Sequence, residues 1–148
     1  MPVRQSVHID APVEEVFDFW ADPRNQERVL PGTRVTDVRR TEEGVGTYVA
    51  WTTRLLGVPV SGFDVVTEFV PNQRITDRSS WSVVGTWTCT FAAEGAGMRF
   101  TVRRHPSSAP LGQSLDALLD RYRTRVTERV LEALEAEVEQ RASARAGT

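Results

Sequence analysis

The chain has 148 residues, of which 40% are hydrophobic and 26% are charged, and its net charge at pH 7 is −2. These values are typical of one globular domain, and they exclude a disordered chain and a strongly basic nucleic-acid-binding protein. Every basic residue is an arginine and Cys89 is the only cysteine, which excludes lysine Schiff-base chemistry and an internal disulfide. With two histidines, the chain also offers little for a zinc site, and we expect no metal and no cofactor.

The N-terminal region predicts one strand followed by two short helices. Apolar and polar residues alternate over residues 3–9, which is typical of a half-buried strand. The segment from Pro12 to Trp20 begins with a residue suited to a helix start and carries apolar residues at intervals of three or four. Pro23 should end this helix, because the residue before a proline avoids the α-helical conformation. A second short helix is expected over residues 24–29.

Six further strands are expected before the end of the chain. They cover residues 35–40, 47–56, 58–69, 74–80, 81–93 and 98–105. The connections between them are short and rich in glycine, proline and asparagine, and none is long enough for a helix. Strands joined in this way form an antiparallel meander.

Beyond residue 110 the spacing of apolar residues changes from two to about 3.6. This spacing predicts one long amphipathic helix that packs on the sheet. Its apolar stripe contains Leu115, Leu118, Leu119, Tyr122, Val126, Val130, Leu134 and Val138. We therefore expect a single domain over residues 1–139 and a frayed tail over residues 140–148.

Several local motifs together resemble a known superfamily. They are Ile9-Asp10-Ala11-Pro12-x-Glu14-x-Val16-Phe17, Asp22-Pro23, Gly44-x-Gly46-Thr47 and Phe69-x-Pro71. Over residues 3–138, the chain resembles the START/polyketide cyclase/SRPBCC superfamily in its polyketide cyclase/dehydrase branch. The resemblance implies an α+β helix-grip fold, in which a seven-stranded curved antiparallel sheet surrounds a long C-terminal helix and an apolar cavity. Its members include aromatase/cyclases and lipid or hormone binders, so the fold does not decide the chemistry.

Alternation along the strands predicts which side chains face this cavity. If no strand contains a bulge, the inner face carries several aromatic, aliphatic and small polar residues, and Tyr122 joins them from the helix. The tryptophans either stack on a flat ligand or simply fill the core. The residues expected to contact a ligand are Trp51, Thr53, Phe63, Val65, Ser79, Trp81, Trp87, Cys89, Phe100 and Tyr122.

Two charged residues, Asp77 and Arg104, fall on the same inner face. A charge on the concave side of a sheet costs several kcal/mol unless it is paired or hydrated. A polar cavity would explain both residues, and so would a position at its rim. Our hypothesis is that Arg104 holds a carboxylate, phenolate or enolate oxygen while Asp77 moves a proton. An aldol-type cyclase requires at least one group that moves a proton and one that stabilises the enolate oxygen.

The sequence leaves three interpretations of the function. The first is a small-molecule-binding protein with an apolar or aromatic ligand, acting as a cofactor-independent cyclase, aromatase or dehydratase. The second is a lipid or metabolite carrier or sensor without chemistry. The third is a protein-interaction accessory subunit, because Leu30-Pro31-Gly32 resembles a segment of the accessory subunit of carbon monoxide dehydrogenases in this superfamily.

The expected partner is thus a small hydrophobic or aromatic molecule. No nucleic acid is expected, because the arginines between residues 121 and 129 are followed by glutamates on the same helix. We find no apolar run of membrane-spanning length and no signal peptide, and we therefore expect a cytoplasmic monomer or homodimer.

Overall fold

A seven-stranded antiparallel sheet and one long helix dominate the computed structural model, which describes residues 3–30, 32–55, 57–80, 85–105 and 113–146. Neighbouring strands follow the order β1-β7-β6-β5-β4-β3-β2, so only the first strand leaves the meander, to pair with the last. This arrangement confirms the helix-grip fold class. The strands are β1 (Val3–Ile9), β2 (Arg34–Arg39), β3 (Tyr48–Leu55), β4 (Val58–Val70), β5 (Arg74–Ser79), β6 (Thr86–Glu94) and β7 (Gly97–His105).

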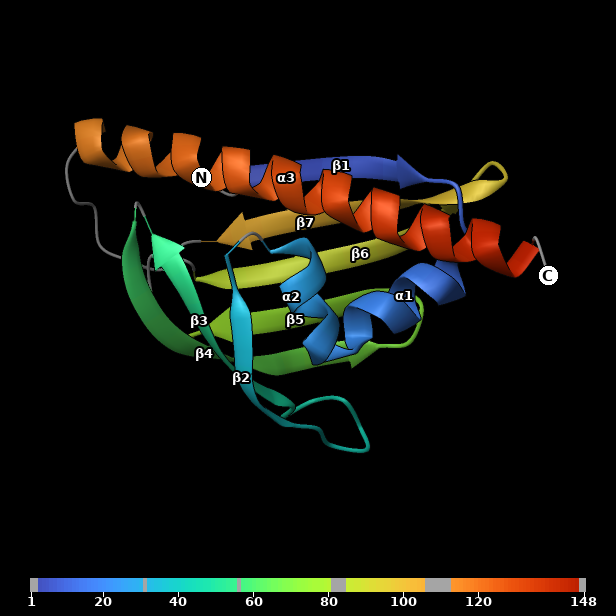
Figure 1. Ribbon diagram of the computed structural model, residues 1–148, viewed down its shortest axis with the longest axis horizontal. Helices are drawn as coiled ribbons and strands as arrows, with labels where there is room; N and C mark the ends of the chain where they lie inside the picture. Colours follow the sequence, from blue (N-terminus) through green and yellow to red (C-terminus); the bar gives the residue numbers. More distant parts are fainter. Residues whose placement is uncertain (1–2, 31, 56, 81–84, 106–112, 147–148) are drawn as a thin grey trace.

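Short helices follow β1, as the prolines predict. Helix α1 covers Val13–Ala21, and the predicted second helix is a 3₁₀ turn, Pro23–Asn25, continued by α2 at Gln26–Val29. The Asp22 carboxylate accepts a hydrogen bond from the backbone N–H of Arg24 at 3.1 Å and thereby caps the turn. Figure 1 shows helix α3, Gln113–Ala146, running along the length of the molecule beside β1, with α1 and α2 in front of the sheet.

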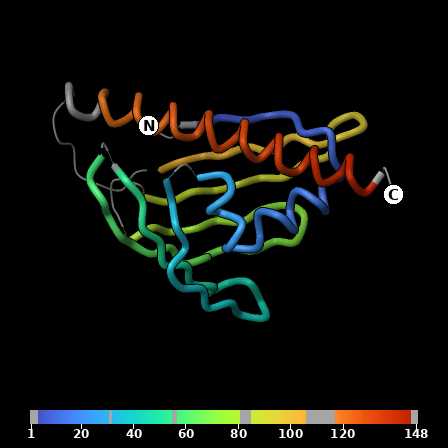
Figure 2. The backbone as a smooth tube through the Cα atoms, in the orientation of Figure 1, coloured from blue at the N-terminus to red at the C-terminus, as the bar shows by residue number. Residues whose placement is uncertain are grey.

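The long helix continues past residue 139, so the prediction of a frayed tail is wrong for residues 140–146. Contacts with α1 hold its last turns in place. The Arg141 guanidinium lies 4.8 Å from the centroid of the Phe19 ring, and Arg145 Nη1 donates to Glu15 Oε1 at 2.9 Å. In the backbone trace of Figure 2, this end of the helix lies beside the blue N-terminal helices.

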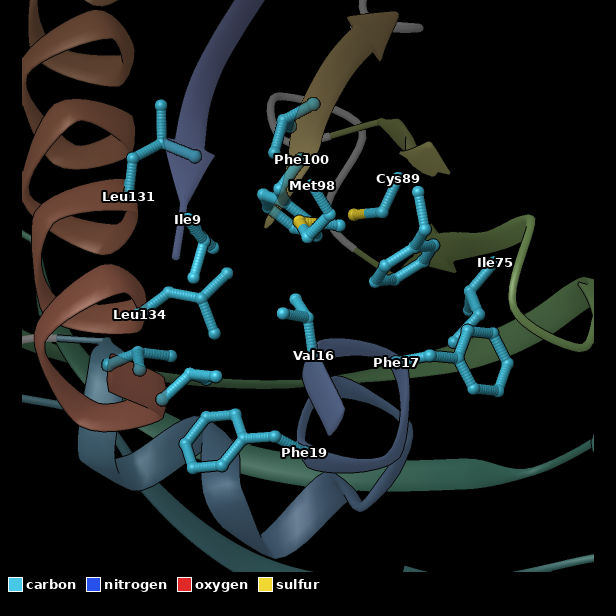
Figure 3. Close-up of a cluster of buried hydrophobic side chains, with 14 of the residues drawn as sticks. Ile9, Val16, Phe17, Phe19, Ile75, Cys89, Met98, Phe100, Leu131 and Leu134 are labelled. Atoms are coloured by element: carbon cyan, nitrogen blue, oxygen red, sulfur yellow. The ribbon is translucent and has the colours of Figure 1, made fainter. Parts of the chain in front are cut away.

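The core fills one end of the space between α3 and the sheet, which we call the packed end (Figure 3). Aromatic rings from α1 and the sheet meet edge to face there, with Phe17 5.1 Å from Phe91 and 5.3 Å from Phe69. The C-terminal half of α3 closes it with side chains that are almost entirely inaccessible. The packed end contains Ile9, Val16, Phe17, Phe19, Cys89, Phe91, Met98, Phe100, Val130, Leu131, Leu134 and Val138.

No helix in the described part of the chain has the length and apolar character needed to cross a membrane.

Candidate functional site

The N-terminal half of α3 covers a large cavity instead of a packed core. Its volume is about 290 Å³, close to the lower limit of typical small-molecule pockets, and most of its surface is apolar. Strands β3, β4, β6 and β7 form its floor, and α2 and α3 form its walls. The lining residues are Gln26, Leu30, Thr33, Trp51, Thr53, Arg54, Val60, Asp64, Trp87, Arg104, Leu119, Tyr122, Arg123, Val126, Thr127 and Arg129.

Arg104 is the most deeply buried charge in this cavity. The residue is 2% exposed, and its Nη2 donates to the neutral amide oxygen of Gln5 at 3.2 Å. No carboxylate of the described residues lies within ion-pair distance of it. Burial and the nearby charge of Arg123 lower the pKa of Arg104 to about 10, so the guanidinium remains charged at neutral pH. The cavity wall thus contains a buried positive charge without an ion-pair partner among the described residues.

Trp87 lies directly opposite Arg104 across the β6–β7 pair and also lines the cavity. Its indole N–H is buried and has no hydrogen-bond partner among the described residues. Buried donors in folded proteins are almost always paired. Two adjacent residues therefore present unmatched groups to the cavity: the indole N–H of Trp87 has no acceptor, and the charge of Arg104 has no carboxylate partner among the described residues.

Asp64 is a site residue that alternation along β4 failed to predict. Its Oδ1 accepts a hydrogen bond from Trp51 Nε1 at 3.1 Å, and it lines the same cavity as Arg104. Burial raises the pKa of the Asp64 carboxyl, and hydrogen bonds from Trp51 and Ser79 partly offset this rise. A carboxyl group of raised pKa in an apolar cavity is suited to accept and return a proton.

The predicted inward positions of Phe63 and Val65 are wrong, and the same shift explains why Asp64 was missed. Leu55 pairs with Val58 across a two-residue turn, so β4 places its even-numbered residues inward as far as Val66. Phe63 lies on the convex face, 43% exposed and 5.4 Å from the Tyr48 ring. An irregularity between Val66 and Glu68 then restores the predicted phase, and Phe69 faces the core.

Glycine at position 62 allows Trp51 to lie against β4. A Cβ atom at this position would come within 2.8 Å of two carbons of the Trp51 ring and 2.9 Å of Ser80 Oγ. These distances are shorter than any ordinary contact, so the indole occupies space that only glycine leaves free. The Trp51 ring is held from one side by Gly62 and from another by Asp64.

Asp77 does not lie in the large cavity, so the prediction that it shares one cavity with Arg104 is wrong. The two residues occupy one register row, with Trp87 between them. Asp77 instead lines a small cavity of about 80 Å³ beneath α1 and the loop after β2. Burial raises the pKa of Asp77 to about 7, and the negative charge of Asp64 adds to this rise.

The other predicted ligand contacts divide into four groups. Trp51, Thr53, Trp87 and Tyr122 line the large cavity together with Arg104. Ser79 faces inward and is buried, yet it bonds to Asp64 and does not line the cavity. Trp81 lies outside the described residues. Two more, Cys89 and Phe100, are fully buried in the packed end.

Burial at the packed end also keeps the thiol of Cys89, the only cysteine, protonated. Burial and the nearby Asp77 charge raise the pKa of the Cys89 thiol well above its usual value. Such a thiol is a poor nucleophile. The described residues contain no group of three His, Cys, Asp or Glu side chains placed to hold a metal ion.

The helical side of the cavity was only partly predictable from the apolar stripe. Leu119, Tyr122 and Val126 lie on the predicted face and line the cavity, whereas Leu118 is 57% exposed. The helix also contributes Arg123, whose Nη1 donates to the Asp120 carboxylate. Arginine recurs every four residues at positions 121, 125 and 129, and this repeat does not include Arg123, so the sequence offered no signal for it.

Solved structures with similar folds include two aromatase/cyclases. The di-domain aromatase/cyclase StfQ of the steffimycin biosynthetic pathway superposes with a TM-score of 0.79 at 17% identity, over 96% of this chain and 51% of that chain. The chain thus spans about half of StfQ. The Zhui aromatase/cyclase from Streptomyces sp. R1128 gives a TM-score of 0.73 at 19% identity, over 96% of this chain and 95% of that one.

A protein of Thermus thermophilus is similar as well, with a TM-score of 0.74, 24% identity and coverage of 93% and 97% of the two chains. At these identities the likeness establishes the fold alone. No curated protein sequence matches the chain significantly. The model of one family, described as polyketide cyclase/dehydrase and lipid transport, matches residues 2–139. With a match over nearly its whole length, and with the helix-grip fold and a cavity beneath its long helix, the chain belongs to the polyketide cyclase/dehydrase and lipid transport family.

Proposed function

We propose that the large cavity binds a small, mostly apolar and flat molecule that carries an acidic group or an enolisable carbonyl group. The observation that carries this proposal is the buried guanidinium of Arg104, without an ion-pair partner among the described residues, in a mostly apolar cavity. An anionic or partly negative oxygen would compensate the charge, while Trp51 and Trp87 offer apolar aromatic surface to the rest of the ligand. Tyr122 offers a hydroxyl from the opposite wall.

We further propose that the bound molecule is a poly-β-ketone and that the protein closes a ring by an aldol reaction. Asp64 removes a proton from a carbon beside a carbonyl group, and Arg104 stabilises the enolate oxygen. The carbon then attacks a second carbonyl of the same chain, and the new alkoxide takes a proton back from Asp64. Loss of the hydroxyl group and a neighbouring proton as water gives the dehydrated ring. The family and the fold of two aromatase/cyclases support this reaction class.

Calorimetric titration with 2-naphthoate, a flat aromatic carboxylate, tests the binding step. Arg104→Met should weaken binding about tenfold to a hundredfold, the effect of losing a hydrogen bond to a charged group. Arg103→Met is the matched control, because Arg103 is the exposed neighbour on the same strand. Neutral 2-methylnaphthalene should bind both variants equally. Equal loss for the neutral and the anionic probe would contradict a charge-specific role for Arg104.

Incubation with a thioester-linked poly-β-ketone, followed by mass spectrometry, tests the chemistry. The wild-type protein should release products that are lighter by one water molecule, and Asp64→Asn should bind the substrate but lose at least about 100-fold in rate. Recovery of the unchanged substrate from a wild-type protein that binds it would instead favour the carrier function.

A further inference from the structure

The small cavity and the large cavity meet at one short stretch of the inner sheet face. Val49 and Asp64 are directly opposite each other on β3 and β4, yet Val49 lines the small cavity and Asp64 lines the large one. Gln26 of α2 lines both cavities. The boundary between the two spaces is therefore a thin wall that includes the polar side chains of Gln26 and Asp64.

Asp77 lies on the small-cavity side of this wall, close to Asp64. In the β4–β5 register, Asp64 pairs with Ser79 and Val66 pairs with Asp77. The two aspartates are thus diagonal neighbours on one face, a relation that separates Cα atoms by about 7–8 Å. At this separation, one water molecule can bridge the two carboxyl groups and pass a proton between them.

The outer end of the small cavity is formed by the loop after β2. Arg40, Thr41 and Glu42 line the cavity there, and all three side chains are exposed to solvent. Backbone hydrogen bonds fix the loop onto β4, with Gly46 N–H donating to Val66 O at 2.8 Å and Val66 N–H donating to Thr47 O at 2.9 Å. The small cavity therefore connects solvent beside Glu42 to the carboxyl of Asp77.

We propose that Asp77 relays protons between solvent in the small cavity and Asp64 in the large cavity. This inference rests on the proposed function, because Asp77 would hold and return the proton that Asp64 takes from the substrate carbon during ring closure. A proton that Asp64 removes from the substrate passes to the Asp77 carboxylate and then to water beside Glu42. For protonation of the alkoxide the steps run in reverse, so each turnover returns both carboxyl groups to their starting state.

The charges around the pair agree with a shared proton. Asp77, whose pKa is raised to about 7, exists in both protonation states near neutral pH. The pKa of Asp64 is also raised, by burial. The charged and titratable side chains that line the two cavities or lie against the pair are Arg40, Glu42, Arg54, Cys89, Arg104, Tyr122, Arg123 and Arg129.

Carbon-13 NMR of the aspartate carboxyl groups, recorded over a pH range of about 4 to 9 without substrate, tests the pair independently of turnover. Asp64→Asn should lower the titration midpoint of Asp77 by about one pH unit, because it removes a negative charge that lies about 7 Å away. Asp37→Asn, which removes an exposed carboxylate on β2, should leave this midpoint unchanged. An unchanged Asp77 midpoint in Asp64→Asn would overturn the relay.

Chemical rescue tests the passage of protons during turnover. Asp77→Ala should slow ring closure about tenfold or more, less than loss of the base itself, and sodium formate should restore part of the rate by placing a carboxylate in the small cavity. Sodium chloride is the control for ionic strength. Full activity of Asp77→Ala, or equal recovery with chloride, would overturn the relay. A lowered Asp77 midpoint in Asp64→Asn, together with a wild-type protein without any turnover, would contradict the proposed function and leave the proton-sharing pair supported.

Discussion

The two halves of α3 face the same sheet but produce opposite results. At the packed end, Val130, Leu134 and Val138 are 0–2% exposed and close the core against α1. In the N-terminal half, Leu119, Tyr122 and Val126 have similar spacing, yet they surround a cavity of about 290 Å³. The difference lies in what stands opposite the helix. Helix α1 inserts Val16, Phe17 and Phe19 at one end, and no described residue fills the other in a comparable way.

An amphipathic stripe therefore specifies that a helix covers a sheet, not how much space remains beneath it. The packed end supplies the free energy of folding, because its side chains are removed from water. The large cavity contributes less apolar burial and keeps a charge, Arg104, without a carboxylate partner among the described residues. Stability and ligand binding should thus respond to different substitutions, and four predictions test this separation.

The largest effect is expected from truncation at the packed end. Leu134→Ala should lower the free energy of unfolding by about 3–5 kcal/mol, because Leu134 is fully buried and its loss leaves a cavity. Leu119→Ala, the same change over the large cavity, should cost less than half as much, since Leu119 already borders empty space. Urea unfolding measures both. Equal losses would contradict the division of α3 into two halves.

The next effect concerns pH. The pKa of Asp77 in the folded protein, about 7, lies above its ordinary value of 3.8, so the folded state binds this proton more tightly than the unfolded state. Its contribution to stability is complete below about pH 4 and is lost as the pH rises through about 7. Relative to the wild type, Asp77→Asn should therefore gain about 4 kcal/mol between about pH 4 and pH 8. Urea unfolding measures the difference in the free energy of unfolding between the variant and the wild type. If this difference stays constant with pH, the pKa of Asp77 is not raised.

A smaller effect is expected at the wall of the large cavity. Trp51→Phe removes the indole N–H that bonds to Asp64 at 3.1 Å, so the pKa of Asp64 should rise further. Binding of 2-naphthoate should weaken about tenfold through lost aromatic contact. Carboxyl NMR and calorimetry measure the two changes. A lower pKa of Asp64 in this variant would contradict the assigned direction of the hydrogen bond's effect.

The smallest effect is expected on the convex face. Phe63→Ala removes a half-exposed ring whose aromatic partner is Tyr48, and it should lower stability by about 1 kcal/mol or less. It should leave 2-naphthoate binding unchanged, in contrast to Trp51→Phe. A loss of 2-naphthoate binding as large as that of Trp51→Phe would instead indicate that the Phe63 side chain faces the cavity.

Alternation and helical spacing predicted the element order and the fold class, because each strand and helix has its own apolar period. They placed Trp51, Trp87 and Arg104 on the inner face correctly. They failed along β4, where Phe63 and Val65 are more hydrophobic than Gly62 and Asp64 but face outward. The two-residue turn between Leu55 and Val58 determines the phase of this strand, and local hydrophobicity does not reveal it.

The inner face also contains two environments that alternation cannot separate. Cys89 and Asp77 both point inward, yet Cys89 lies in the packed end and Asp77 in the small cavity. The position of α1 above the sheet decides which inward residue is covered. That position depends on packing between distant segments, and no pattern within a single strand records it.

Gly62 shapes the large cavity without lining it. Because its missing side chain leaves room for the Trp51 ring, any larger residue at this position must push the indole away from β4. The displaced indole would then occupy part of the cavity and reduce its volume. The volume of the large cavity is thus adjustable from a position outside its lining, while the cavity-lining residues Arg104 and Asp64 stay unchanged.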